Sequence, residues 1–103
     1  MEQMIYVDES PIHGKGVFAR VDIPEGAHLG DYQGPVVKED GLYVLWIQDE
    51  DAGEEYGIDG QNALRYLNHR RRPNAEFDGE KLFAQNPIVA GSEITIHYGA
   101  DWD

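Results

Sequence analysis

The chain has 103 residues, enough for one domain of the usual size, which runs on the order of 100 to 150 residues. Eight Lys and Arg against twenty Asp and Glu give a formal net charge of −12. Phosphate binding needs clustered positive charge, so this balance argues against nucleic acid and suits a basic partner. Without cysteine, neither disulfides nor thiolate zinc sites can stabilise the fold.

The first residues, 1–6, lack a basic segment followed by a long apolar stretch, which is the pattern of a secretory signal. No apolar run approaches the roughly 20 residues of a membrane span. We therefore expect an intracellular, cytoplasmic protein that does not contact membranes, with one domain over residues 1–103.

Twelve scattered glycines divide the chain into short segments, which excludes a long amphipathic helix and favours β structure. The predicted strands are short and carry β-branched or aromatic residues, at 4–7, 16–19, 27–32, 42–47, 56–58, 75–77, 82–84 and 93–98. One helical turn is expected over 62–67, with Asn62 as its cap. The fold class predicted is therefore mainly β.

Charged residues gather in two predicted loops. Acidic side chains cluster at 49–55 around Gly53, either as a plain solvated loop or as a surface that attracts a basic substrate. Arginines follow at 70–72, where Pro73 favours extended geometry in the residue before it.

Three further segments carry polar residue types that could serve a site. The first, 13–19, places glycines before an apolar strand but lacks the spacing of a phosphate-binding loop, so alone it reads as a turn. The second, 62–75, contains Asn68, His69 and Asn74, whose side chains need hydrogen-bond partners when buried. No second ligand is suitably spaced from His69, so no metal site is predicted. The third, 90–99, is an alternating strand that ends on Tyr98.

Taken together, these segments resemble the SET domain of protein lysine methyltransferases. The matching patterns are Gly-x-Gly-Val-Phe-Ala at 14–19, Arg-Tyr-Leu-Asn-His-x-x-x-Pro-Asn at 65–74 and Gly-x-Glu-Ile-Thr-Ile-x-Tyr-Gly at 91–99. A fourth, Gly-Asp-Tyr-Gln-Gly at 30–34, is similar to a family strand that ends in tyrosine and glycine. The similarity covers nearly the whole chain, and its central and last patterns are specific.

The resemblance implies short folded-over sheets with short helical turns and a knot-like core, in which the Asn68-His69 segment is threaded beside the strand ending at Tyr98. It also implies an enzyme that transfers a methyl group from S-adenosylmethionine to a lysine of a basic, lysine-rich protein. The cofactor cleft and the substrate groove would be joined by a narrow channel for the lysine.

The site residues follow from the same resemblance. Lys15 and Gly16 match positions whose backbone holds the cofactor, and Asn68 and His69 match the pair that anchors it. Tyr98 matches the catalytic tyrosine, which also borders the cofactor. Tyr32 and Phe77 match aromatic positions of the lysine channel, with Tyr32 counted among the catalytic residues. Trp102 either covers the cofactor or belongs to a frayed terminus.

Two departures leave an alternative open. Arg70 and Arg71 stand where the family usually has Ser-Cys, and His97 stands where Asp commonly precedes the catalytic tyrosine. The cysteine-bearing flanks of many eukaryotic members are missing from this sequence. A noncatalytic SET-like module that binds a peptide or the cofactor is therefore the competing interpretation. So small a domain also leaves room for a homodimer that covers its grooves.

Overall fold

The computed structural model describes residues 4–49 and 53–99 and confirms a mainly β fold. Its strands, in chain order, are β1 (Ile5–Glu9), β2 (Lys15–Ala19), β3 (His28–Asp31), β4 (Val36–Val37), β5 (Val44–Asp49), β6 (Glu54–Asp59), β7 (Asn68–His69), β8 (Ala75–Asp78), β9 (Lys81–Ala84) and β10 (Glu93–Ile96). A short 3₁₀ helix, η2 (Ala63–Tyr66), precedes β7.

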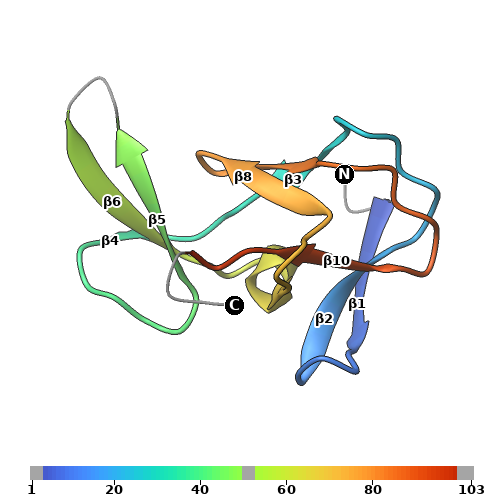
Figure 1. The fold of residues 1–103 in the computed structure, drawn as a ribbon. Coiled ribbons are helices and arrows are strands. Elements are labelled where there is room, and N and C mark those ends of the chain that lie inside the picture. Colours follow the sequence, from blue (N-terminus) through green and yellow to red (C-terminus); the bar gives the residue numbers. More distant parts are fainter. Residues whose placement is uncertain (1–3, 50–52, 100–103) are drawn as a thin grey trace.

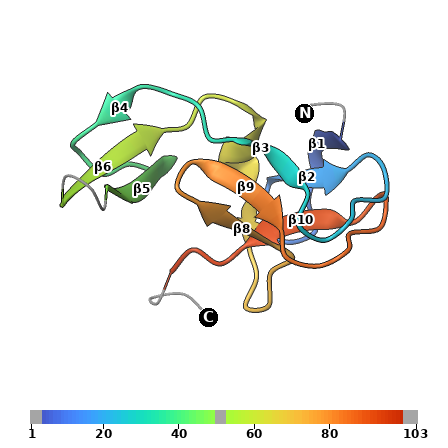
Figure 2. The ribbon, with the colours of Figure 1, turned by 90° about the horizontal axis from the view of Figure 1, so that it is seen from above.

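The strands form three small sheets with orders β1-β2-β10-β7, β3-β9-β8 and β4-β6-β5. Figures 1 and 2 show β4, β5 and β6 projecting at one end of the molecule and β1 and β2 at the other, with β8 and β10 between them. This is the folded-over arrangement expected from many short strands, because no single strand is long enough to build one wide sheet.

The predicted threading is confirmed by the pairing of β7 with β10. These strands run parallel, with Asn68 opposite Thr95 and His69 opposite Ile96. Strands β7 and β4 were not predicted, because each has only two residues, too few to show alternation. The last strand is shorter than predicted: β10 ends at Ile96, and residues 97–99 follow outside the ladder.

The core is built from alternating residues of these strands. Val17, Leu29, Leu82 and Ile94 are almost fully buried, and they come from strands of two different sheets. Asn68 and Thr95 are the buried polar residues among those described. Because Asn68 and Thr95 face each other at the β7–β10 pairing, the centre of the threaded region is polar and needs internal hydrogen bonds.

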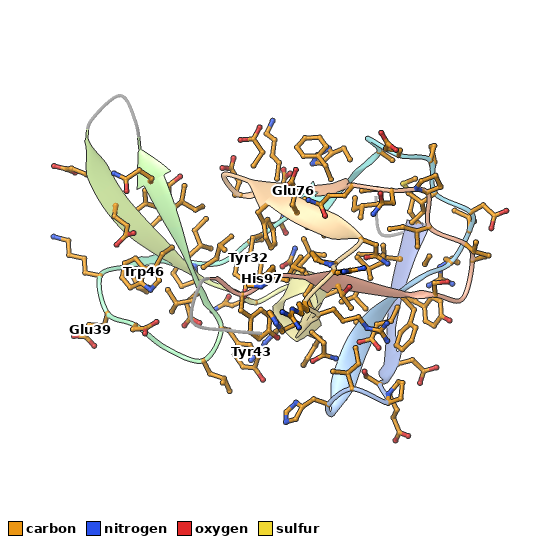
Figure 3. The ribbon with its side chains drawn as sticks, viewed as in Figure 1. Tyr32, Glu39, Tyr43, Trp46, Glu76 and His97 are labelled. Atoms are coloured by element: carbon orange, nitrogen blue, oxygen red, sulfur yellow. The ribbon has the colours of Figure 1, made fainter. Side chains whose placement is uncertain are left out.

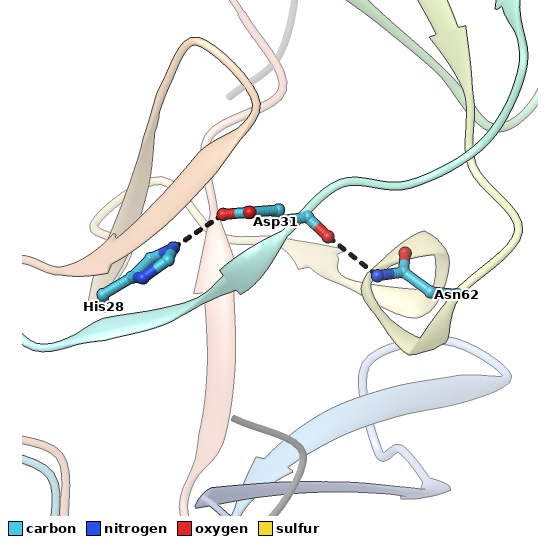
Figure 4. A network of polar contacts seen from close by, with 3 residues as sticks. All are labelled: His28, Asp31 and Asn62. Carbon is cyan, nitrogen blue, oxygen red and sulfur yellow. Dashed lines mark hydrogen bonds and ion pairs between the residues drawn. The ribbon is translucent and has the colours of Figure 1, made fainter.

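Helix η2 confirms the predicted turn, but Asn62 does not cap it. No cap hydrogen bond forms from its side chain; instead its Nδ2 donates to the carbonyl of Asp31 at 2.7 Å. Figure 4 shows this contact beside a second one, in which His28 Nε2 lies 2.6 Å from Asp31 Oδ1. Asn62 therefore ties η2 to Asp31 at the end of β3. This contact helps to set the position of Tyr32, which follows Asp31 in the chain.

No helix in the two described stretches is long and apolar enough to cross a membrane.

Candidate active site

A cavity of about 840 Å³ lies between the β4-β6-β5 sheet, β8, η2 and the segment after β10. In Figure 3, Tyr32 and His97 lie at the middle of the molecule, with Trp46 on the side of β5 and Glu76 on β8. The walls are mostly aromatic and aliphatic, with a few charged groups: Tyr32, Tyr43, Trp46, Phe77, Tyr98, Leu67, Asp40, Arg65, Glu76 and His97. Such a lining suits a long apolar side chain that carries a polar end.

Three hydrogen bonds position Tyr98, two made by Tyr98 itself and one by Gly99. Its hydroxyl donates to the carbonyl of Leu67 at 2.6 Å, and its backbone N–H donates to His69 Nδ1 at 2.9 Å. The following amide, of Gly99, donates to His97 Nδ1 at 3.1 Å. Burial, and then the negative charge of Glu93, raise the pKa of the Tyr98 hydroxyl. Tyr98 therefore presents a protonated hydroxyl of defined direction at the cavity wall.

Tyr32 and Phe77 are brought together as the resemblance implied. Their rings meet edge to face with centroids 5.7 Å apart, and both line the cavity with Tyr98. Tyr32 is only 8% exposed, and its hydroxyl donates to the Tyr43 carbonyl at 2.5 Å. A Cβ at residue 60 would lie 2.4 Å from the Tyr32 ring, so Gly60 is needed for this ring to fit. Tyr32 is thus a packed wall residue whose hydroxyl proton is already engaged.

Burial, followed by the charge of Asp59, raises the pKa of Tyr32 to about 12 from its usual 10.0. A raised pKa in the folded state means that the unfolded chain loses its proton first as the pH rises. The contribution to stability is complete below about pH 10 and is lost as the pH approaches 12. The free energy of unfolding should therefore decrease between about pH 10 and pH 12.

We expect Tyr32→Phe to lower the free energy of unfolding by about 1 kcal/mol at pH 8, where one hydrogen bond is lost. The Tyr43 carbonyl keeps a second donor, the Gly60 amide at 2.9 Å, which limits the loss. Between pH 10 and 12 the deficit should shrink, because the variant has no hydroxyl to ionise there. Urea unfolding at several pH values measures this, with Tyr6→Phe in β1 as the matched control. If the difference in the free energy of unfolding between Tyr32→Phe and the unmodified protein stayed constant with pH, the raised pKa of Tyr32 would be contradicted.

A partly buried network of hydrogen bonds joins the threaded strands to the turn before β2. Asn68 Nδ2 lies 3.1 Å from the His13 carbonyl, 3.0 Å from the Lys15 carbonyl and 2.8 Å from Glu93 Oε2. The Glu93 carboxylate also accepts from the Ser10 hydroxyl at 2.8 Å. Asn68 therefore holds the backbone of the 13–16 turn in place beside β7.

The 13–16 turn includes the first two residues of β2, Lys15 and Gly16. A Cβ on Gly16 would lie 2.3 Å from Glu93 Oε2, so a larger residue would displace the carboxylate from Asn68. The Lys15 ammonium lies 5.5 Å from the centre of the Tyr66 ring. The Lys15 side chain thus lies against η2, while its backbone carbonyl accepts from Asn68.

Sequence reasoning missed several residues that shape the site. Glu93 belongs to the pattern at 91–99, and a carboxylate in an otherwise apolar strand could have indicated a residue with polar partners. Tyr43 gave no signal, and Arg65 was only the first residue of the pattern at 65–74. Their contact depends on tertiary structure: the Arg65 guanidinium carbon lies 4.1 Å from the Tyr43 ring centre. Trp102, predicted to border the cofactor, lies outside the described residues.

The comparisons with known proteins agree with this geometry. A family model described as SET domain matches residues 14–99. Human histone-lysine N-methyltransferase 2B is 29% identical over 119 residues, covering 94% of this chain and 4% of that protein. The histone-lysine N-methyltransferase, H3 lysine-36 specific, of Debaryomyces hansenii is 28% identical, covering 94% of this chain and 16% of that protein. The chain thus spans only a small part of these relatives.

Two solved structures share the fold. The methyltransferase domain of human histone-lysine N-methyltransferase SETMAR has a TM-score of 0.79 at 24% identity, covering 91% of this chain and 44% of that one. The methyltransferase domain of human PR domain-containing protein 2 has a TM-score of 0.74 at 22% identity, covering 98% of this chain and 81% of that one.

Proposed function

This chain belongs to the SET-domain family, and from that premise we propose that it is a protein lysine methyltransferase that uses S-adenosylmethionine. One observation carries the proposal: Tyr98 joins a mostly apolar cavity to the buried Asn68 network. The backbone amide of Tyr98 is bound by His69, the neighbour of Asn68 in β7. One tyrosine therefore stands where a lysine channel and a cofactor cleft would meet.

S-adenosylmethionine, when bound, supplies a methyl group on a positively charged sulfur. The chain has to align a neutral amine with that carbon and to keep water away. Loss of water between the aromatic walls of Tyr32, Phe77 and Tyr43, together with the positive charge on that sulfur, would lower the pKa of an entering lysine. An entering lysine would release its proton to solvent and so present a lone pair for attack.

Tyr98 would orient the amine. Its hydroxyl proton is directed at the Leu67 carbonyl, so the oxygen lone pairs remain for accepting a hydrogen bond. An amine that donates one N–H to this oxygen has its own lone pair directed elsewhere, toward the methyl donor. Because the pKa of Tyr98 is raised, the hydroxyl stays protonated and keeps this direction at physiological pH.

We propose a basic protein as the substrate. The chain carries a net charge of −12, and Asp40, from the loop before β5, and Glu76, from β8, both line the cavity. Asp40 is oriented by the Trp46 indole, whose Nε1 donates to Oδ1 at 3.1 Å. Cationic residues beside the target lysine would be attracted to these carboxylates. The acidic 49–55 segment, whose residues 50–52 lie outside the described ones, would add to this field.

We expect Glu76→Gln to raise the KM for a lysine-rich peptide about twofold to fivefold at low salt, the scale of one exposed charge pair. The difference from the unmodified protein should vanish as salt approaches 1 M, where the Debye length falls to about 3 Å. Glu9→Gln on β1, exposed and outside the cavity, removes the same charge and is the matched control. If both variants raised the KM equally, Glu76 would act only through the net charge of the protein and not through its place in the cavity.

The direct test of the proposed function is incubation with labelled S-adenosylmethionine and a panel of basic proteins, followed by mass mapping of the modified residue. We expect label on lysine side chains. Binding of the cofactor without transfer to any protein would favour the noncatalytic module instead.

A further inference from the structure

Two histidines hold the backbone on both sides of the Tyr98 side chain. The Tyr98 amide donates to His69 Nδ1 at 2.9 Å, and the Gly99 amide donates to His97 Nδ1 at 3.1 Å. The two imidazole rings meet edge to face with centroids 4.5 Å apart, and His97 also lines the cavity. The peptide that carries Tyr98 therefore depends on imidazole nitrogens acting as acceptors.

This arrangement requires a particular protonation state. A neutral imidazole has one acceptor nitrogen and one donor nitrogen, so acceptance at Nδ1 places the hydrogen on Nε2. Protonation puts a hydrogen on Nδ1 as well, where it would point at a backbone N–H. Either hydrogen bond is then lost. A positive charge on one ring disfavours a second positive charge on the other at this separation. Protonation of either ring alone is therefore enough to break one of the two hydrogen bonds.

The second of these contacts has a simple replacement. His97 Nδ1 accepts from the amide two residues later, which is the pattern that Asn and Asp side chains form in Asx turns. The similarity to the SET family placed a common Asp at this position. An Asn or Asp at 97 could thus make the same backbone contact without titrating near neutral pH.

We propose that His97 is a positioning residue which, with His69, aligns Tyr98 only while both imidazoles are neutral, so that methyl transfer carries a proton-dependent loss on the acid side. The kinetic part of this inference rests on the proposed function. The structural part, loss of the hydrogen bonds at two amides, does not.

Other charged groups surround the pair among the described residues. Arg70 follows His69, and its amide donates to the Ile96 carbonyl at 3.0 Å. The cavity walls add Asp40 from the loop before β5, Glu76 from β8 and Arg65 from η2, while Glu93 of β10 acts on Tyr98. Carboxylates and guanidinium groups ordinarily keep their charge between pH 6 and 8, whereas imidazoles change theirs. The histidines are therefore the groups that can respond in this range.

The structural test follows amide hydrogen exchange of Tyr98 and Gly99 by NMR between pH 8 and 6, corrected for intrinsic exchange. In the unmodified protein we expect the protection of both amides to fall with pH. In His97→Asn the protection of Gly99 should stay constant. Unchanged protection of both amides in the unmodified protein would overturn the proposal, whether or not the chain transfers methyl groups.

The kinetic test compares kcat of the unmodified protein with that of His97→Asn over the same range. Deprotonation of the substrate lysine affects both equally, so it cancels in the ratio. We expect this ratio to fall from pH 8 to pH 6, because only in the unmodified protein can a proton occupy the Nδ1 acceptor of residue 97. His97→Leu, which has no acceptor, should lower kcat more than it raises KM, and His28→Gln should keep the unmodified pH profile. A ratio independent of pH, or a His97→Leu effect confined to KM, would remove His97 from the positioning of Tyr98.

Discussion

Tyr98→Phe is expected to reduce the rate of methyl transfer by roughly 100-fold or more, the scale of losing one positioned hydroxyl in an active site. Phenylalanine keeps the ring beside His69, whose centroid lies 5.2 Å from that of Tyr98, and keeps the backbone contact to His69. It deletes only the hydroxyl that donates to the Leu67 carbonyl and that would accept from the amine. Single-turnover rates with saturating cofactor measure this step directly.

The folded state should change little in this variant. The Tyr98 side chain is 43% exposed, so one lost hydrogen bond should cost about 1 kcal/mol. Cofactor affinity should stay near that of the unmodified protein, because Asn68 and the 13–16 turn are untouched. Transfer close to the original rate in a folded Tyr98→Phe protein would exclude this hydroxyl from the reaction and favour the binding-module interpretation.

Asn68→Ala is expected to weaken binding of S-adenosylmethionine at least about tenfold, which corresponds to about 1.4 kcal/mol. The side chain is 6% exposed and bonds the His13 and Lys15 carbonyls. Without it, the turn that would border the cofactor loses its anchor on β7. The variant should also lose about 2 to 3 kcal/mol of stability, because the Glu93 carboxylate loses its amide donor.

A stability loss alone could imitate a binding defect, so a matched variant is needed. Asn74→Ala serves, because Asn74 Nδ2 donates to the Glu93 carbonyl at 2.9 Å and its Oδ1 accepts from the Thr95 amide at 2.9 Å. Both asparagines therefore brace β10, but only Asn68 reaches the 13–16 turn. In thermal unfolding, a bound ligand raises Tm by mass action. We expect the shift caused by S-adenosylmethionine to persist in Asn74→Ala and to shrink in Asn68→Ala. Equal shifts in the two variants would refute a role for Asn68 in the cofactor site.

The sequence by itself determined the fold class and singled out the candidate site residues. Short β-branched segments between glycines were sufficient for a mainly β prediction, since alternation and turn residues are local signals. The patterns around Asn68 and Tyr98 singled out the central residues, because each pattern keeps its amino acids within a few positions of one another. The site lining was predicted in the same way at Tyr32 and Phe77, which meet in the cavity.

Only the tertiary structure decided how these residues act on one another. Asn68 could have capped its own turn, but the parallel pairing of β7 with β10 directs it to the carbonyls of His13 and Lys15. The hydroxyl of Tyr32, predicted to be catalytic, lies against the Tyr43 carbonyl because β3 and the segment before β5 meet there. In the sequence, His97 was only a departure from the Asp that is common at this position. The structure places its ring against the ring of His69. Each of these contacts joins residues whose separation along the chain carries no local signal, so packing of the threaded strands alone specifies them.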